Sequence, residues 1–194
     1  MDNVEFFDKI APKWDGMCDV NASKIAHILD VAEITKGDEV LDVGTGTGVL
    51  IPFLTDRIME GKVVGVDMSS GMLHEAQKKF GNYDNVEFRL LDVETDLIPE
   101  KFDHVIMYCM FPHLEDGIET VKWLVSVNLR QKGTLVIAHP ESRHAINEVH
   151  HRHSPDGTEE LHNITELVDR LKEQGLNVDY QEDNNEYYIV RIRA

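Results

Sequence analysis

The sequence is poor in cysteine, with only Cys18 and Cys109 among its 194 residues. Two thiols so far apart in the chain do not suggest a disulfide framework. Long apolar runs are also missing, since no stretch approaches the ~18 apolar residues that a membrane-spanning helix requires. The first residues are acidic and lack the basic and apolar regions of a signal peptide. We therefore expect a soluble, cytoplasmic protein that does not insert into a membrane.

Basic residues are scarce: 19 lysines and arginines stand against 36 aspartates and glutamates, which gives a net charge of −17. A field of this sign repels the phosphates of nucleic acids and anionic membrane surfaces. The composition therefore predicts that nucleic acid is not a partner. The length and the apolar fraction of 42% suit a single globular domain, residues 1–194, with a sizeable core.

What the sequence does contain is a glycine-rich stretch at residues 39–51. Its first part, Glu39–Val43, is typical of a buried parallel strand, and Gly44, Gly46 and Gly48 then follow at alternate positions. A strand that passes through such a turn into a helix is the first unit of a nucleotide-binding α/β fold, because glycine lets a ligand approach the main chain. The dinucleotide fingerprint G-x-G-x-x-G would need a third glycine at position 49, which is Val49.

The D-x-G-x-G-x-G pattern that begins at Asp42 resembles motif I of the class I S-adenosylmethionine-dependent methyltransferases. The resemblance implies that S-adenosylmethionine is the cofactor and that this turn binds it through Asp42, Gly44, Thr45, Gly46 and Gly48. A purely structural turn and an NAD site are the alternatives for the same stretch.

Acidic residues stand at the ends of the next two predicted strands. Asp67 follows the strand 62–66 and lies 23 residues after Gly44, where an acid hydrogen-bonds ribose hydroxyls in this class of fold. The segment 67–73 resembles the methyltransferase pattern D-x-S-x-x-M-L, which implies that Met68 contacts adenine. By the same resemblance, Asp92 accepts from the adenine amino group and Val93 donates its backbone N–H. A helix cap at Asp67 and a solvated loop acid at Asp92 are the alternatives.

The N-terminal stretch 4–16 places aromatic and aliphatic residues at helical spacing, and Pro12 ends or bends the element. It resembles the F-D-x-x-A-x-x-Y/W-D segment that precedes the core of small-molecule methyltransferases, including those of quinone biosynthesis. The resemblance implies that residues 1–36 form a helical lid over the cofactor, which Trp14 contacts. A helix that only packs on the core 37–194 is the alternative.

Histidine is the unusual residue: ten occur, and six of them lie between His139 and His162. We treat 139–162 as a histidine-rich insertion that begins where the fifth strand opens onto the substrate. Imidazole is the commonest protein ligand of zinc, copper, iron and nickel. His139 and His150, with His113 or His153, are therefore candidates to hold one divalent transition metal. A catalytic base, a substrate contact and a solvated surface helix are the alternatives.

The fourth predicted strand, 102–108, places Tyr108 and then His113 beyond its carboxyl end, where ligands bind in open α/β sheets. Tyr108 is a candidate for both cofactor contact and catalysis. His113, His139 and His150 are the candidates for a catalytic base.

The resemblance covers nearly the whole chain and implies an α/β, Rossmann-like methyltransferase fold, with a seven-stranded sheet of order 3-2-1-4-5-7-6 and helices on both faces. It implies methyl transfer from S-adenosylmethionine to a small-molecule acceptor, assisted by a base or by a histidine-bound metal. A non-catalytic module that senses S-adenosylmethionine or a metal, and an NAD-dependent oxidoreductase, are the rival functions. The sequence leaves open the acceptor, the atom that is methylated, and whether the chain forms a homodimer.

Overall fold

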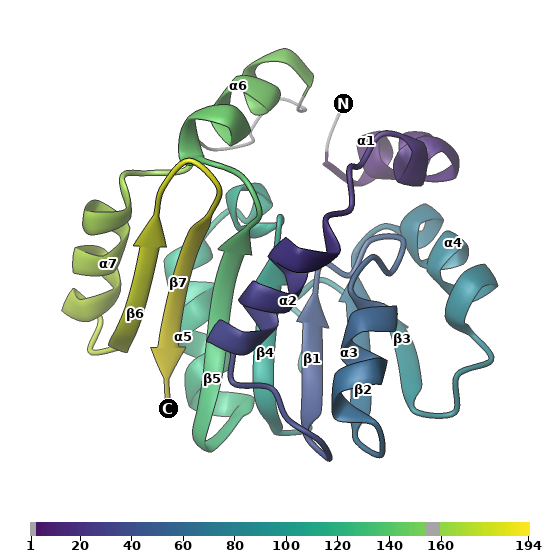
Figure 1. Ribbon diagram of the computed structural model, residues 1–194, viewed down its shortest axis with the longest axis horizontal. Helices are drawn as coiled ribbons and strands as arrows, with labels where there is room; N and C mark the ends of the chain where they lie inside the picture. Colours follow the sequence, from purple (N-terminus) through teal and green to yellow (C-terminus); the bar gives the residue numbers. More distant parts are fainter. Residues whose placement is uncertain (1–2, 154–159) are drawn as a thin grey trace.

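The computed structural model describes residues 3–153 and 160–194, apart from the side chain of His153. In this part of the chain, seven strands form one sheet of order β3-β2-β1-β4-β5-β7-β6, which confirms the predicted order (Figure 1). The strands β1 to β5 pair in parallel, and β7 is antiparallel to both of its neighbours. The strands are β1 (Glu39–Val43), β2 (Lys62–Asp67), β3 (Val86–Leu90), β4 (Phe102–Tyr108), β5 (Leu129–His139), β6 (Asn177–Asp183) and β7 (Tyr188–Arg193).

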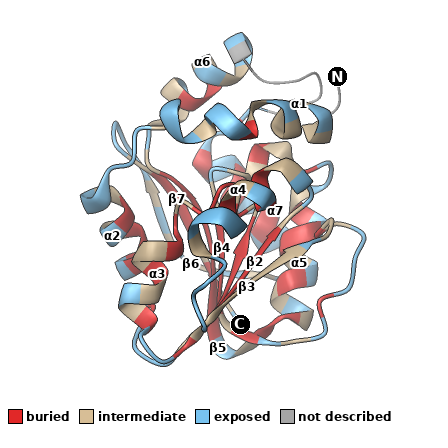
Figure 2. Cartoon of the chain, turned by 90° about the vertical axis from the view of Figure 1, so that its right-hand side faces the viewer, coloured by how far each residue is buried: buried red, intermediate tan, exposed pale blue. Residues whose placement is uncertain are grey.

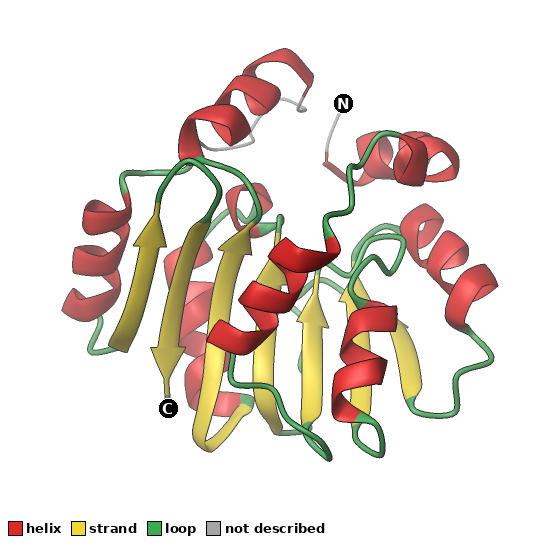
Figure 3. Ribbon diagram, viewed as in Figure 1, coloured by secondary structure: helices red, strands yellow, loops and turns green. Residues whose placement is uncertain are grey.

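Helices cover both faces of the sheet, as Figure 3 shows. On one face lie α2 (Ala22–Val31) and α3 (Ile51–Ile58), and on the other lie α5 (Gly117–Val127) and α7 (Ile164–Glu173). The remaining helical elements are α1 (Asn3–Ile10), α4 (Ser70–Phe80), α6 (Arg143–His153) and the short 3₁₀ helices η1 (Ala11–Gly16) and η2 (Phe111–His113). The change from α1 to η1 falls just before Pro12, which agrees with the expected break.

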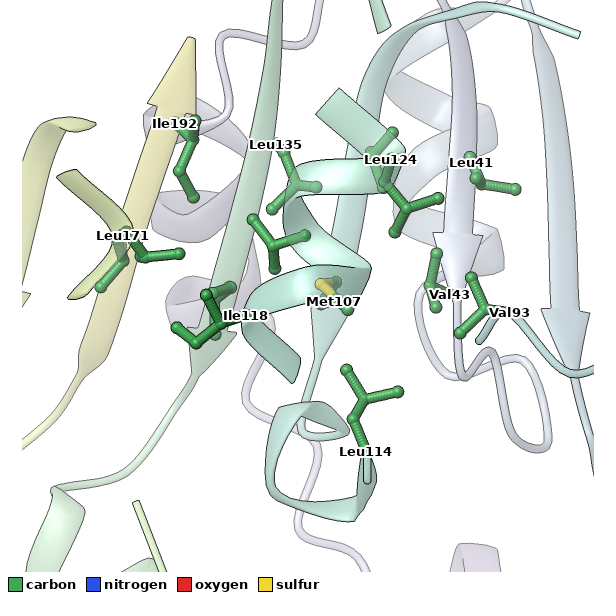
Figure 4. Packing of buried hydrophobic residues seen from close by; sticks show 14 of the residues in the cluster. Leu41, Val43, Val93, Met107, Leu114, Ile118, Leu124, Leu135, Leu171 and Ile192 are labelled. Carbon is green, nitrogen blue, oxygen red and sulfur yellow. The ribbon is translucent and has the colours of Figure 1, made fainter. Parts of the chain in front are cut away.

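The central strands are buried on both faces, as their continuous apolar sequences predict. Leu41 and Val43 of β1 belong to the hydrophobic cluster on the α5 and α7 side, whereas Val40 belongs to the cluster on the α2 and α3 side. Figure 4 shows Leu41, Val43 and Met107 within the first cluster, and Figure 2 shows that buried residues concentrate in the strands. Each such side chain contributes roughly 1.5–3 kcal/mol by leaving water.

The parallel strands bring the predicted site residues to one edge of the sheet. Because β1, β2, β4 and β5 run in the same direction, the glycine turn, Asp67, Tyr108 and His139 all stand at carboxyl ends. The helices α1 and α6 lie beyond this edge in both Figure 1 and Figure 2. Within residues 3–153 and 160–194, no helix has the length and apolar content needed to cross a membrane.

Candidate functional site

The glycine turn at residues 44–48 has an open position at its centre. Gly44, Gly46 and Gly48 have positive φ angles of 69°, 55° and 84°, a conformation that favours glycine. A Cβ atom at Gly44 would lie 2.8 Å from the Cβ of Met110, and one at Gly48 would lie 2.9 Å from the ring of Phe80. A Cβ atom at Gly46 would meet only the carbonyl oxygen of Gly44, at 4.0 Å. Gly44 and Gly48 thus make room for the protein's own side chains, whereas Gly46 leaves free space beside the main chain.

The carboxylate of Asp67 lies next to this open position. Its Oδ2 accepts a hydrogen bond of 2.8 Å from the backbone N–H of Gly46, and its Oδ1 accepts one of 2.8 Å from the backbone N–H of Ser69. Burial and, to a smaller extent, the charge of Asp8 raise the pKa of Asp67, whereas the backbone N–H groups of Ser69, Gly46 and Met68 oppose that shift. The cap of α4 is Ser69, whose hydroxyl accepts from the N–H of Met72. Each oxygen of Asp67 therefore keeps a lone pair for a further donor beside the turn.

Asp42 is a buried acid at the start of the same turn. It is 1% exposed, and its Oδ2 accepts a hydrogen bond of 2.7 Å from the hydroxyl of Thr45. Removal from water raises the pKa of Asp42 to about 7; the charge of Asp67 adds to this shift, and the Thr45 hydroxyl opposes it. Two neighbouring acids make this end of the sheet receptive to a positively charged ligand.

The other predicted cofactor contacts differ in their surroundings. Met68 is 42% exposed and presents an apolar side chain next to Asp67. Asp92 follows β3, and its carboxylate accepts hydrogen bonds of 2.9 and 3.1 Å from the loop that comes after it. Val93 packs in the hydrophobic core. Asp92 thus organises its own turn, and a cofactor contact by Asp92 and Val93 stays a prediction.

Two acids of the N-terminal segment attach it to the carboxyl edge of the sheet. Asp8 of α1 accepts hydrogen bonds from the Ser69 hydroxyl, at 2.6 Å, and from a backbone N–H in the first turn of α4, at 2.7 Å. The Ser69 hydroxyl also holds the pKa of Asp8 below its usual value. Asp15 of η1 accepts a hydrogen bond of 2.5 Å from Thr47 in the glycine turn. Sequence reasoning missed both contacts, although the two acids are the D positions of the F-D-x-x-A-x-x-Y/W-D pattern.

Aromatic side chains continue from this segment toward η2. The ring of Trp14 packs edge-on against Phe7, with centroids 5.7 Å apart. Phe7 packs in the same way against His113, at 5.2 Å. The Nδ2 of Asn3 donates a hydrogen bond of 3.2 Å to the carbonyl oxygen of His113. The N-terminal segment therefore contacts η2 as well as α4 and the glycine turn.

Three of the predicted histidines meet from three different elements: His139 ends β5, His113 ends η2, and His150 belongs to α6. The rings of His113 and His150 have centroids 5.3 Å apart. Burial, reinforced by the other two histidines, lowers the pKa of His139 to about 3. Burial and the neighbouring His150 lower the pKa of His113 to about 4. His113 and His139 are therefore neutral at pH 7.

The structure gives no support to the predicted metal. Among the residues that the structure describes, no group of three or more His, Cys, Asp or Glu side chains is arranged to hold a metal ion. The side chain of His153 lies outside the described residues. His144 and His151 are exposed, and His151 pairs with Glu160 at 3.0 Å. The histidine-rich segment thus has an inner part that includes His139 and an outer part that behaves as a solvated surface.

Tyr108 and Cys109 stand at the carboxyl end of β4. Burial raises the pKa of the Tyr108 hydroxyl, so this group stays protonated and can donate a hydrogen bond, but it is no base at neutral pH. Cys109 has a positive φ of 56°, which is uncommon for a residue other than glycine, and it is exposed.

Comparison with known proteins points to methyltransferases. The methyltransferase domain family matches residues 34–191. Malonyl-[acyl-carrier protein] O-methyltransferase of Acetivibrio thermocellus is 32% identical over 134 residues, which are 68% of this chain and 47% of that protein. The chain thus spans about half the length of this curated relative.

Solved structures share the fold. A putative methyltransferase solved with a methyltransferase activator of Haloferax volcanii has a TM-score of 0.82 and 22% identity, with 100% of this chain and 98% of that chain covered. A S-adenosylmethionine-dependent methyltransferase from Aquifex aeolicus has a TM-score of 0.75 and 22% identity, with 94% and 97% covered. The chain therefore belongs to the methyltransferase domain family and has the Rossmann-like fold of class I S-adenosylmethionine-dependent methyltransferases.

Proposed function

We propose that this chain transfers a methyl group from S-adenosylmethionine to a small-molecule acceptor. The observation that carries the proposal is the Asp67 carboxylate bound to the backbone N–H of Gly46, beside the free space that Gly46 leaves. In this class of fold, an acid at the end of the second strand hydrogen-bonds ribose hydroxyls. Membership of the methyltransferase domain family supports the same function.

The residues at the carboxyl edge fit this cofactor. The main chain at 44–48 would receive the amino-acid portion, Asp67 the ribose hydroxyls and Met68 the adenine ring. The acids Asp42 and Asp67 suit the positive charges of a sulfonium and an amino group. Further contacts in this proposal come from Thr45, Asp92, Val93, Tyr108 and Trp14.

Bound S-adenosylmethionine supplies a methyl group on a sulfur that is a good leaving group. The chain's own task is then to hold the acceptor in line with that methyl group and to take up a proton where the acceptor carries one. His139, His113 and His150 are the candidates for the second task, and Tyr108 is a hydrogen-bond donor to the bound ligands.

The N-terminal segment would cover the bound cofactor. Asp8 attaches the segment to the start of α4, and Asp15 attaches it to the glycine turn, so both anchors lie on elements that would hold the cofactor. Phe7 and Trp14 add aromatic surface, which excludes water from a reaction that disperses charge. The same contacts would also serve a fixed helix of the domain, and the Trp14→Ala variant separates the two interpretations.

The acceptor and any protein partner belong to this proposal as well. The Acetivibrio thermocellus relative is named for malonyl-[acyl-carrier protein], so an acyl group on a carrier protein is the rival acceptor. The Haloferax volcanii neighbour was solved with an activator, so a small activator protein is a candidate partner. Cytoplasmic location and a homodimer stay predictions.

A labelling experiment tests the function. The purified chain is incubated with S-adenosylmethionine that carries an isotope in its methyl group and with a small-molecule extract, and labelled products are separated. We expect labelled small molecules with the wild type and much less label with Asp67→Asn, which keeps the size of the side chain and removes its charge. Equal labelling by both proteins would contradict the role of Asp67. Cofactor binding without product would favour the non-catalytic module, and binding of NAD instead of S-adenosylmethionine would favour the oxidoreductase.

A further inference from the structure

The Nε2 atom of His139 is buried and has no hydrogen-bond partner among the described residues. His139 is 2% exposed, and its ring packs against Tyr188 with centroids 6.1 Å apart. Buried polar atoms in folded proteins nearly always have a partner, because the hydrogen bond to water that they give up must be replaced. This nitrogen stands at the carboxyl end of β5, on the edge where open α/β sheets bind ligands. Its position and its unused hydrogen-bonding capacity point to a bound molecule as its partner.

His139 is part of a group that α1, η2 and α6 help to enclose. The rings of His113 and His150 lie 5.3 Å apart and are tilted by 59°, and both histidines help to lower the pKa of His139. Phe7 of α1 packs on His113 from another side, at 5.2 Å. We call His113, His139 and His150 the histidine site. The rings that surround it are imidazole and aromatic, which would suit a ligand with an apolar frame and one polar atom.

Charge limits what the histidine site can bind. The surroundings keep His113 and His139 neutral at pH 7. A neutral imidazole offers one N–H donor and one nitrogen acceptor, but no positive charge to pair with a carboxylate. A ligand with a hydroxyl group can donate to the acceptor nitrogen without bringing a charge into a buried place.

We propose that the histidine site binds the methyl acceptor, and that this acceptor is an uncharged molecule whose phenol-type hydroxyl donates its hydrogen bond to His139 Nε2. This inference rests on the proposed function and narrows its substrate class. It makes His139 a catalytic residue, because His139 touches the attacking atom.

The transfer step balances in atoms and charge. The acceptor oxygen forms its bond to the methyl carbon while the carbon–sulfur bond breaks and its electron pair stays on sulfur. The hydroxyl proton passes to His139 Nε2. The positive charge thus leaves the sulfonium and appears on the imidazolium, so the net charge of the site is unchanged. Because burial disfavours the imidazolium, His139 takes up the proton only as the sulfonium loses its charge, and it then releases the proton readily.

A carboxylate acceptor is the rival, and it would use a different residue. Arg143, in the first turn of α6, is half-buried and makes no hydrogen bond or ion pair with any described residue. Its charge acts on the Tyr188 hydroxyl. A carboxylate would therefore bind at Arg143 and leave His139 Nε2 without a partner. The hydroxyl, unlike the carboxylate, would give the buried His139 Nε2 a partner, which favours the hydroxyl.

Nuclear magnetic resonance of protein with ¹⁵N-labelled histidine tests the inference. The protein is loaded with S-adenosylhomocysteine and titrated with three probes of one ring frame: phenol, anisole, which lacks the hydroxyl proton, and benzoate, which is an anion. We expect phenol to shift the His139 resonances and the other two to do so at least about tenfold more weakly. Equal shifts with anisole, stronger shifts with benzoate, or no shift of His139 with any probe would each overturn the proposal.

Variants and a separate binding measurement keep the two proposals apart. His139→Gln should lower the affinity for phenol about tenfold and leave that for S-adenosylhomocysteine unchanged, while His144→Gln, a control at an exposed position of α6, should change neither. If His139→Gln does not fold, the wild-type titration alone decides. Calorimetry of S-adenosylhomocysteine binding tests the proposed function: binding of the nucleoside with no phenol effect at His139 refutes only the acceptor inference. If the nucleoside does not bind, the proposed function fails, and the phenol titration of the free protein still decides the histidine site.

Discussion

Replacement of His139 by glutamine is expected to change how stability depends on pH. The pKa of His139 is about 3 in the folded protein, against an ordinary value of 6.5. Between these two values the unfolded chain binds a proton at His139 that the folded chain does not bind, so stability is lost as the pH falls below 6.5. At about 1.36 kcal/mol for each pH unit, the loss from this residue reaches about 2 kcal/mol at pH 5. Glutamine does not titrate and therefore lacks this term.

The assay is urea unfolding of the wild type and of His139→Gln at pH 7 and at pH 5. We expect the stability difference between the two proteins to move by about 2 kcal/mol in favour of the variant when the pH falls to 5. The raised pKa of Asp42 acts in the opposite direction, but it is present in both proteins and cancels. His144→Gln controls for the loss of a histidine at an exposed place. A difference that does not change between the two pH values would refute the claim that His139 is held neutral by burial.

Three further predictions concern the cofactor side of the molecule. Gly46→Ala should cost about 1–2 kcal/mol in stability, because φ is 55° at this position. It should also weaken S-adenosylmethionine binding at least about tenfold in calorimetry, because the added methyl group enters the free space beside the turn. An unchanged affinity would contradict the binding of a ligand in that space. Because the pKa of Asp42 is raised to about 7, the folded protein loses stability as the pH rises from about 4 towards 7. Asp42→Asn should therefore stabilise the ligand-free protein at pH 8, by at most about 4 kcal/mol in urea unfolding. A variant that is less stable than the wild type at pH 8 would contradict this. If the N-terminal segment is a lid, Trp14→Ala should weaken S-adenosylmethionine binding. Asp8→Asn should then speed protease cleavage within residues 3–16, because the hydrogen bond to Ser69 is weakened. An unchanged affinity and an unchanged cleavage rate would instead support a helix that only packs on the core.

Local sequence patterns predicted the core of the fold well. The apolar runs at 39–43 and 62–66 indicated central strands, and both are buried on two faces. The three glycines indicated a turn with positive φ, and all three have it. The order of the strands came from the resemblance rather than from these patterns, because periodicity within one strand carries no information about which strand lies beside it.

Contacts between distant residues could not be predicted in the same way. Asp8 lies 61 positions before Ser69, and nothing local to either residue indicates their hydrogen bond. The glycines were expected to make room for a ligand, yet Gly44 and Gly48 face Met110 and Phe80, since only tertiary packing brings those side chains to the turn.

The histidines show the same limit. The composition of 139–162 indicated a metal, whereas metal binding depends on distances between side chains, and these follow from which face of α6 is buried. Asn147 is buried and binds the backbone of Leu161, while His144 and His151 face outward. Sequence spacing alone placed these residues on faces of a helix without showing which face would be buried against the rest of the domain.

The central claim is that the turn at 44–48 and the carboxylate of Asp67 bind S-adenosylmethionine together. Calorimetric titration of S-adenosylmethionine into the wild type, into Asp67→Asn and into Asp92→Asn tests it most directly. The account predicts saturable binding by the wild type and a loss of roughly a hundredfold in Asp67→Asn, because two hydrogen bonds to a charged group disappear. We expect a smaller loss in Asp92→Asn, whose carboxylate already bonds to its own loop. No binding by the wild type, or equal binding by the wild type and Asp67→Asn, would contradict the account.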